Sequence, residues 1–246
     1  MKQKRFKKLK SKLKLSVWRY AAINYINRYI FKNTNVVFCN VMSPSSLSKK
    51  RQPFVFGFDY IRTSSLELIA NEIYEKNIVG NVAELGVYKG MFAACINMAF
   101  PDRKLYLFDT FEGFDARDLE IETIKGYSKG CSTIDENFSN TSVELVLSKM
   151  VHKENCIIKK GYFPETIDGI NEKFAFVSID ADLYEPIYQG LNYFYDNLSE
   201  GGYIMLHDYN NIEFTGAKAA LRKFSEERKV PFYPLCDVGG SAIIMK

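Results

Sequence analysis

The sequence predicts an open α/β sheet that is mostly parallel and closes with an antiparallel strand. Short apolar runs alternate along residues 59–246 with segments that have the 3.6-residue spacing of helices. Several of the apolar runs end in an acidic residue. The last segment, FYPLCDVGGSAIIMK, has the pattern of a hairpin-like pair around a Gly-Gly turn. One sheet with covering helices accounts for all three observations.

The charge of the chain is unevenly distributed. Residues 1–58 hold 14 of the 33 Lys and Arg residues and none of the 29 acidic residues, so residues 59–246 carry a net charge of −10. This division predicts a basic N-terminal arm and linker over 1–58 and one domain over 59–246. The five cysteines are scattered without a CxxC pair, which fits the cytoplasm. We expect neither a transmembrane helix nor a signal peptide.

The N-terminal arm begins with MKQKRFKKLKSKLK, in which Phe6, Leu9 and Leu13 share a helical stripe. We expect a basic amphipathic helix that continues through residues 17–31. Such a helix suits a solvated tail or a homo-oligomer contact. It also suits attachment to an anionic membrane surface, at the inner face of the membrane. Nucleic-acid binding is the least favoured role, because no RNA-binding motif accompanies the charge.

The elements of the domain follow in order. A stripe that includes Leu66 and Ile73 predicts a helix over 62–76. The polar, glycine-containing connection 111–140 is long enough to predict a functional loop or lid. The remaining helices are predicted at 91–100, 141–150, 185–198 and 215–228, and the strands at 82–85, 104–109, within 155–167, at 174–180, at 201–207 and in the final pair.

A glycine turn follows the first predicted strand. The pattern is Glu84-x-Gly86-x-x-x-Gly90, which differs from GxGxxG but likewise lets a ligand approach the backbone at a helix N-terminus. The second strand, KLYLFD, ends in Asp109. In nucleotide-binding sheets an acid at this place accepts hydrogen bonds from ribose hydroxyls. We therefore expect these four residues to bind a nucleoside-containing cofactor.

Two further apolar runs, FAFVSI and GGYIML, are also followed by polar clusters. Asp180 and Asp182 follow the first run, and His207 and Asp208 follow the second. A helix-length segment separates the runs, so they form a parallel unit whose strand ends meet at one edge of the sheet. Three carboxylates and an imidazole at one place predict a divalent-metal site, a proton-transfer site, or both.

Together these features indicate a class I S-adenosylmethionine-dependent methyltransferase, and the sequence resembles the macrocin O-methyltransferase family, which modifies sugar hydroxyls of antibiotics. The resemblance implies a Rossmann-like fold with a mostly parallel seven-stranded sheet and an antiparallel edge strand. It also implies S-adenosylmethionine and Mg²⁺, or a similar divalent ion, as cofactors. The matching segments are AELGVYKG (83–90), LFDTFEGF (107–114), KGYFPET (160–166), SIDADLYEP (178–186) and LSEGGYIMLHDY (198–209).

The resemblance implies a role for each of these residues. Those predicted to bind the cofactor match the family's cofactor turn and ribose acid. Asp180 matches a metal ligand, and Asp182 matches the proposed general base. His207 and Asp208 stand where the family has two aspartates that bind the metal. His207 is thus a departure, which leaves three roles open: a supporting group outside the ligands, a ligand that favours Mn²⁺, or a proton acceptor.

The leading hypothesis is an O-methyltransferase for a hydroxyl of a sugar or glycan-linked small molecule, in polysaccharide biosynthesis. A second hypothesis is a catechol-type O-methyltransferase, which uses a similar arrangement of metal and acids. A third, of a different class, is a non-catalytic module that binds S-adenosylmethionine or a nucleotide and docks through its basic arm.

Overall fold

The structure is a computed structural model that describes residues 18, 21–33, 59–127 and 138–246. The chain divides into two compact units, Met1–Lys50 and Arg51–Lys246. In the first unit, residues 21–25 are helical and continue as a π-helical turn, η1 (Ile26–Ile30). The predicted helix over 1–14 and the predicted domain boundary after residue 58 lie outside the described residues.

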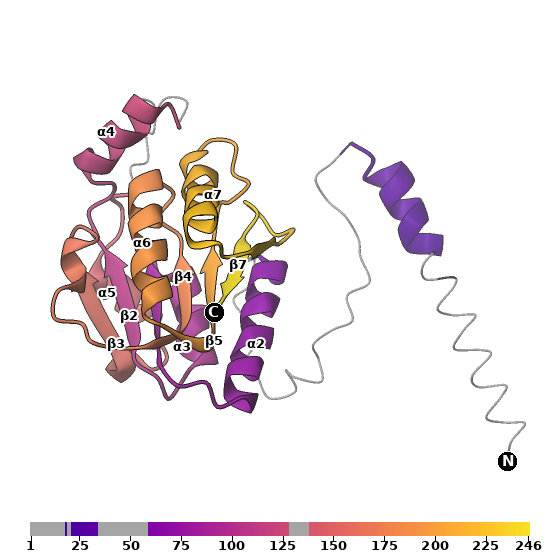
Figure 1. Cartoon of the computed structure of the whole chain (residues 1–246). Helices are drawn as coiled ribbons and strands as arrows, with labels where there is room; N and C mark the ends of the chain where they lie inside the picture. Colours follow the sequence, from indigo (N-terminus) through magenta and orange to yellow (C-terminus); the bar gives the residue numbers. More distant parts are fainter. Residues whose placement is uncertain (1–17, 19–20, 34–58, 128–137) are drawn as a thin grey trace, which may run out of the picture. The chain divides into compact units, whose positions relative to one another are not determined.

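The second unit is a seven-stranded sheet with helices on both faces (Figure 1). The strands are β1 (Asn81–Leu85), β2 (Leu105–Asp109), β3 (Cys156–Lys160), β4 (Phe174–Ile179), β5 (Leu198–Leu206), β6 (Phe232–Pro234) and β7 (Ala242–Met245). The helices are α2 (Tyr60–Glu75), α3 (Met91–Ala99), α4 (Ala116–Lys125), α5 (Val143–Ser148), α6 (Tyr184–Asp196) and α7 (Gly216–Arg228), with short turns η4 (Lys153–Asn155) and η5 (Glu165–Ile167).

The strand order is β3-β2-β1-β4-β5-β7-β6. Neighbours from β3 to β5 are parallel, and β7 is antiparallel to both β5 and β6. The predicted mostly parallel sheet with an antiparallel strand at one side is therefore confirmed, with β7 lying one place inside the short strand β6. The order reverses between β1 and β4, and ligands of open α/β sheets bind at such a switch point.

The apolar runs form central strands because both faces of the sheet are covered. In β4, Val177 and Ile179 face the cluster that includes α6 and α7, whereas Phe176 faces the cluster of α2 and α3. Figure 1 shows α6 and α7 side by side in front of the strands, in agreement with their extensive contact. A strand buried on both faces has a continuous apolar sequence, as FAFVSI does.

The segment 111–140, predicted as a functional loop or lid, contains the helix α4. Asp115 caps α4 by accepting a hydrogen bond from Arg117 N, and Gly126 ends the helix in the left-handed conformation. The spacing of apolar residues did not predict this helix, because the residues that it buries are acidic, Asp118 and Glu122. Residues 128–137 of the predicted lid lie outside the described residues. Within the described part of the chain, no helix combines the length and hydrophobicity required to cross a bilayer.

Candidate active site

The residues that follow β1, β2, β4 and β5 meet at one edge of the sheet. Backbone hydrogen bonds continue past the strand ends: Asp180 N donates to Leu85 O at 2.8 Å, and His207 N donates to Ile179 O at 2.8 Å. On the other side, Gly86 N donates to the carbonyl oxygen of Phe108 in β2 at 2.9 Å. The segments predicted to carry the cofactor turn and the acids are thus held next to one another.

A cavity of about 590 Å³ opens at this edge. Its lining includes, among others, the residues Glu84, Gly86, Asp109, Asp180, Asp182, His207 and Asp208. The structure therefore brings three of the four predicted cofactor residues, together with the predicted catalytic and metal residues, into one space. Gly90 is not among the lining residues; it precedes α3 in the left-handed conformation, with φ of 73°.

Gly86 lets the cofactor turn cross the end of β4. Its φ is +81°, and a Cβ atom at this position would lie 2.2 Å from the carbonyl oxygen of Asp180. No other residue fits such a contact, and the left-handed conformation adds strain for any side chain. The glycine therefore sets how closely the turn approaches the acidic strand end.

Asp109 holds the same turn from the side of β2. Its Oδ2 accepts hydrogen bonds from Val87 N at 2.7 Å and Tyr88 N at 2.8 Å, and its Oδ1 accepts one from Phe111 N at 2.6 Å. A carboxylate has about four lone-pair sites, so Oδ1 retains one for a further donor. The predicted contact with a ribose hydroxyl is compatible with this second, structural role.

Glu84 lies at the end of β1 and is 1 % exposed. Burial raises the pKa of its carboxyl group well above the usual value, although the Arg62 charge opposes this shift. Its Oε2 has no hydrogen-bond partner among the described residues. A buried unpaired acceptor in a cavity lining is unfavourable on its own, and a ligand donor such as an ammonium group would satisfy it. This residue thus fits a cationic, nitrogen-bearing cofactor.

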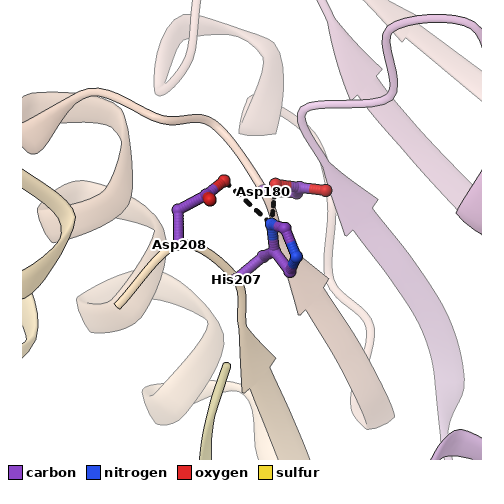
Figure 2. Close-up of side chains that lie close together, drawn as sticks. All are labelled: Asp180, His207 and Asp208. Carbon is purple, nitrogen blue, oxygen red and sulfur yellow. Dashed lines mark hydrogen bonds and ion pairs between the residues drawn. The ribbon is translucent and has the colours of Figure 1, made fainter. Parts of the chain in front are cut away.

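Asp180, His207 and Asp208 converge on the ring nitrogen Nδ1 of the histidine (Figure 2). Nδ1 lies 3.1 Å from Asp180 Oδ1 and 2.8 Å from Asp208 Oδ2. One donor atom from each residue lies within 4.8 Å of the other two. Two carboxylate oxygens and one imidazole nitrogen can together surround a single cation.

The other ring nitrogen explains how the imidazole is oriented. His207 Nε2 lies 2.9 Å from the carbonyl oxygen of Val238, which can only accept, so Nε2 carries a proton. A histidine that binds a metal usually donates its second ring N–H to such a carbonyl group. The donor set therefore fits a divalent ion, and the resident nitrogen distinguishes it from an all-oxygen site.

Without an ion, Nδ1 must itself be protonated to satisfy the two carboxylates. Burial alone would lower the pKa of His207, but Asp180 and Asp208 outweigh it and raise the pKa to about 10. Burial would likewise raise the pKa of Asp180, but the charges of Arg62 and His207 hold that pKa well below its usual range.

Asp182 differs from its neighbours in both charge and backbone. Burial first, and then the charges of Asp180 and Asp208, raise the pKa of Asp182 well above its usual value. Its φ is 57°, and that of Asp208 is 56°. Non-glycine residues in this region cost about 1–3 kcal/mol each and cluster at functional sites. Neither aspartate after β4 caps α6; Glu122 Oε1 instead accepts from Tyr184 N at 2.5 Å.

The sequence reasoning missed Arg62, which lies in α2 and is 2 % exposed. Its Nη2 contacts Asp180 Oδ2 at 3.0 Å and Ser178 Oγ at 3.4 Å. A buried arginine beside a predicted ligand neutralises part of the negative charge of the cluster. No local signal in the sequence marks this residue, because its partners lie more than a hundred positions away.

The chain matches a family model and several known proteins. The family model of macrocin O-methyltransferase (TylF) matches residues 58–246. Demethyldecarbamoylnovobiocin O-methyltransferase of Streptomyces niveus is 25% identical over 160 residues, 60% of this chain and 60% of that protein. Mycinamicin III 3''-O-methyltransferase of Micromonospora griseorubida is 26% identical over 166 residues, 60% of this chain and 62% of that protein. The alignments thus span about 60% of the length of these relatives.

Solved structures agree on the fold. The O-methyltransferase NovP superposes with a TM-score of 0.60 at 18% identity, covering 75% of this chain and 79% of that chain. The calicheamicin methyltransferase CalS11 superposes with a TM-score of 0.58 at 18% identity, covering 75% and 78%. These likenesses confirm the predicted class I methyltransferase fold. Through residues 58–246, the chain belongs to the macrocin O-methyltransferase family.

Proposed function

We propose that this protein is an S-adenosylmethionine-dependent O-methyltransferase that acts on a hydroxyl of a sugar or glycan-linked small molecule. The observation that carries the proposal is the shared cavity, which is lined both by the cofactor turn and by Asp180, His207 and Asp208, the acid–imidazole cluster. Membership of the family supports it, as do the names of two relatives, both O-methyltransferases. A metal-and-acid layout alone would suit a catechol too, so the sugar assignment rests on the family and on the rhamnosyl group in the name of a further O-methyltransferase relative, from Streptomyces olivaceus.

The cofactor would occupy the side of the cavity beside the glycine turn. Glu84 offers its unpaired oxygen to a donor of the cofactor, and Asp109 offers the remaining lone pair of Oδ1 to a ribose hydroxyl. Gly86 lines the cavity and lets the turn pass close to the acidic strand end. Gly90 contributes by starting α3, whose N-terminal N–H groups favour negative charge such as a carboxylate.

The acceptor hydroxyl would lie at the acidic strand ends. Methyl transfer forms an oxygen–carbon bond and breaks the carbon–sulfur bond of the sulfonium, leaving S-adenosylhomocysteine. The hydroxyl proton passes to the carboxylate of Asp182. Its surroundings raise the pKa of this residue, which makes it a stronger base than an ordinary aspartate. His207, beside it, is a second group able to carry a proton.

A divalent ion is proposed to be held by Asp180, His207 and Asp208. Such an ion would supply polarisation of vicinal hydroxyls and so lower the pKa of the one that reacts. Mg²⁺ prefers oxygen ligands, whereas imidazole suits Mn²⁺ and later transition metals. The nitrogen of His207 therefore favours Mn²⁺ over Mg²⁺ at this site.

The proposal is tested first with the cofactor and then with acceptors. Calorimetric titration with S-adenosylmethionine, with and without Mn²⁺ or Mg²⁺, measures binding directly. Labelled cofactor and a panel of nucleotide sugars and glycan fragments then identify the acceptor. We expect Asp182→Asn to abolish transfer while cofactor binding persists, and Asp168→Asn, an exposed aspartate, to change neither. A chain that binds no S-adenosylmethionine is not a methyltransferase.

The N-terminal arm is proposed to rest on an anionic membrane surface at its cytoplasmic face. Residues 1–14 supply the positive charge, and exposed aromatic side chains follow in the first unit: Trp18 is 74% exposed, Tyr25 62% and Tyr29 63%. Aromatic rings and basic residues together suit the headgroup region. Deleting residues 2–14 should remove binding to anionic vesicles. If vesicle binding persists, and light scattering of the full chain reports a dimer that the deletion dissociates, the arm is an oligomer contact instead.

A further inference from the structure

The first turn of α2 lies beside the acid–imidazole cluster although it belongs to none of the predicted motifs. Asp59 caps this helix, and its Oδ1 accepts hydrogen bonds from Ile61 N at 2.8 Å and Arg62 N at 3.2 Å. The cap fixes the direction in which the helix enters the domain. Two side chains of this turn then reach the two strand ends that carry the cluster.

Arg62 reaches the end of β4. Its guanidinium group donates to Asp180 Oδ2 at 3.0 Å, and its Cζ lies 3.8 Å from the ring centre of Phe92 in α3. The fork is held between this ring and the carboxylate and is almost fully buried. With Oδ2 engaged, Asp180 presents Oδ1 to His207 Nδ1 at 3.1 Å. Arg62 thereby decides which oxygen of Asp180 faces the cluster.

Asp59 reaches the end of β5 through one backbone residue. Its Oδ2 accepts a hydrogen bond from Val238 N, and the carbonyl oxygen of Val238 accepts from His207 Nε2 at 2.9 Å. The next residue, Gly239, packs so closely that a Cβ there would lie 2.6 Å from Asp208 Oδ1. The position of this loop therefore determines where the imidazole and Asp208 stand.

We propose that Asp59 and Arg62 are positioning residues, which together fix the orientations of the Asp180 carboxylate and the His207 ring for the reaction. Asp59 acts through Val238 on Nε2, and Arg62 acts through Asp180 on Nδ1, so the ring is fixed from both nitrogens. The consequence for catalysis rests on the proposed methyl transfer. The positioning itself is a property of the fold and is measurable without any substrate.

Two conservative variants test whether Asp59 and Arg62 position the His207 ring. In Asp59→Asn the amide oxygen can still cap the helix, since Asn is as good a cap as Asp, but the NH₂ group cannot accept from Val238 N. In Arg62→Lys the charge remains and the fork is lost. The matched controls are Asp115→Asn, which changes the cap of α4, and Arg103→Lys, whose guanidinium donates to backbone carbonyls of Ile78 and Gly80 before β1.

The readout is nuclear magnetic resonance of the two histidine rings, because the chain has only His152 and His207. In the wild type, we expect a slowly exchanging Nε2–H signal from His207. Asp59→Asn should lose this signal to exchange with water, and Arg62→Lys should shift the ring nitrogens of His207. His152 should keep its shifts in both. Unchanged His207 signals in both variants, or equal changes in the two controls, would overturn the proposal.

Turnover adds a second readout, because a general loss of stability would not lower kcat selectively at an unchanged KM. On an acceptor found by the screen above, both variants should lower kcat about tenfold, the lower end for losing a group that orients a ligand, with KM for S-adenosylmethionine unchanged. A wild-type kcat in both variants contradicts the proposed positioning role. If no transfer occurs even in the wild type, the proposed function fails. The histidine signals still decide whether Asp59 and Arg62 position the ring.

Discussion

Replacing Asp109 by Asn removes an acceptor that the cofactor turn depends on. The carboxylate accepts three backbone N–H groups, two at Oδ2 and one at Oδ1. In the better amide orientation, the single oxygen keeps Val87 N and Tyr88 N, and Phe111 N loses its acceptor. An unpaired backbone donor costs about 1–3 kcal/mol, and two hydrogen bonds that lose their charge assistance cost about 1 kcal/mol each. The total is about 3–5 kcal/mol.

This loss should be visible in both stability and cofactor binding. For a domain of this size, about 3–5 kcal/mol lowers Tm by roughly 10 °C, which scanning calorimetry measures. Binding of S-adenosylmethionine should weaken as well, because the turn and the ribose acceptor change together. Asp102→Asn is the control, since Asp102 is an exposed aspartate that accepts from a side chain, Tyr74, and not from a turn. A Tm within about 2 °C of the wild type, with intact cofactor binding, would refute the reasoning.

Three further predictions concern other parts of the cavity. Gly86→Ala should abolish cofactor binding through its backbone clash, whereas Gly169→Ala, which is equally left-handed but has no atom near its Cβ, should cost only about 1 kcal/mol in denaturant unfolding. His207→Asp should reduce the preference for Mn²⁺ over Mg²⁺ about tenfold in competition experiments followed by electron paramagnetic resonance, and His152→Asp should not. Burial raises the pKa of Asp118 to about 6, so its ionisation destabilises the fold above that pH. Asp118→Asn should therefore stabilise the protein at pH 7, and the gain should vanish as the pH falls from about 6 to 4; an equal gain at both pH values would contradict this.

Residues at strand ends could be predicted from the sequence because parallel strands bring their carboxyl ends to one edge. Asp109, Asp180 and His207 each follow a recognisable apolar run, and the glycine turn follows another. Parallel strands share this edge whatever their order in the sheet. The location of the site could therefore be predicted from local sequence patterns, whereas the distances and contacts within it could not.

Residues that reach the site from outside the strands gave no such signal. Arg62 looks like an ordinary surface residue in the first turn of a helix, and its partner Asp180 lies 118 positions further on. Glu122 sits in a polar segment, yet it is fully buried and caps α6. Both roles depend on how α2 and α4 pack against the sheet, which periodicity within a single helix does not specify.

The left-handed conformation of Asp182 has a consequence for engineering this protein. Glycine at this position would relieve about 1 kcal/mol of backbone strain and would remove a carboxyl group that Asp180 and Asp208 crowd, so a library selected for heat resistance would be enriched in this variant. At Asp208, which is also left-handed, the same change would lose the hydrogen bonds to His207 and Asn211, so no gain is expected there. Thermostability screens on this scaffold should therefore keep Asp182 unmutated, since the most stable clones would otherwise lack the side chain proposed here to accept the proton.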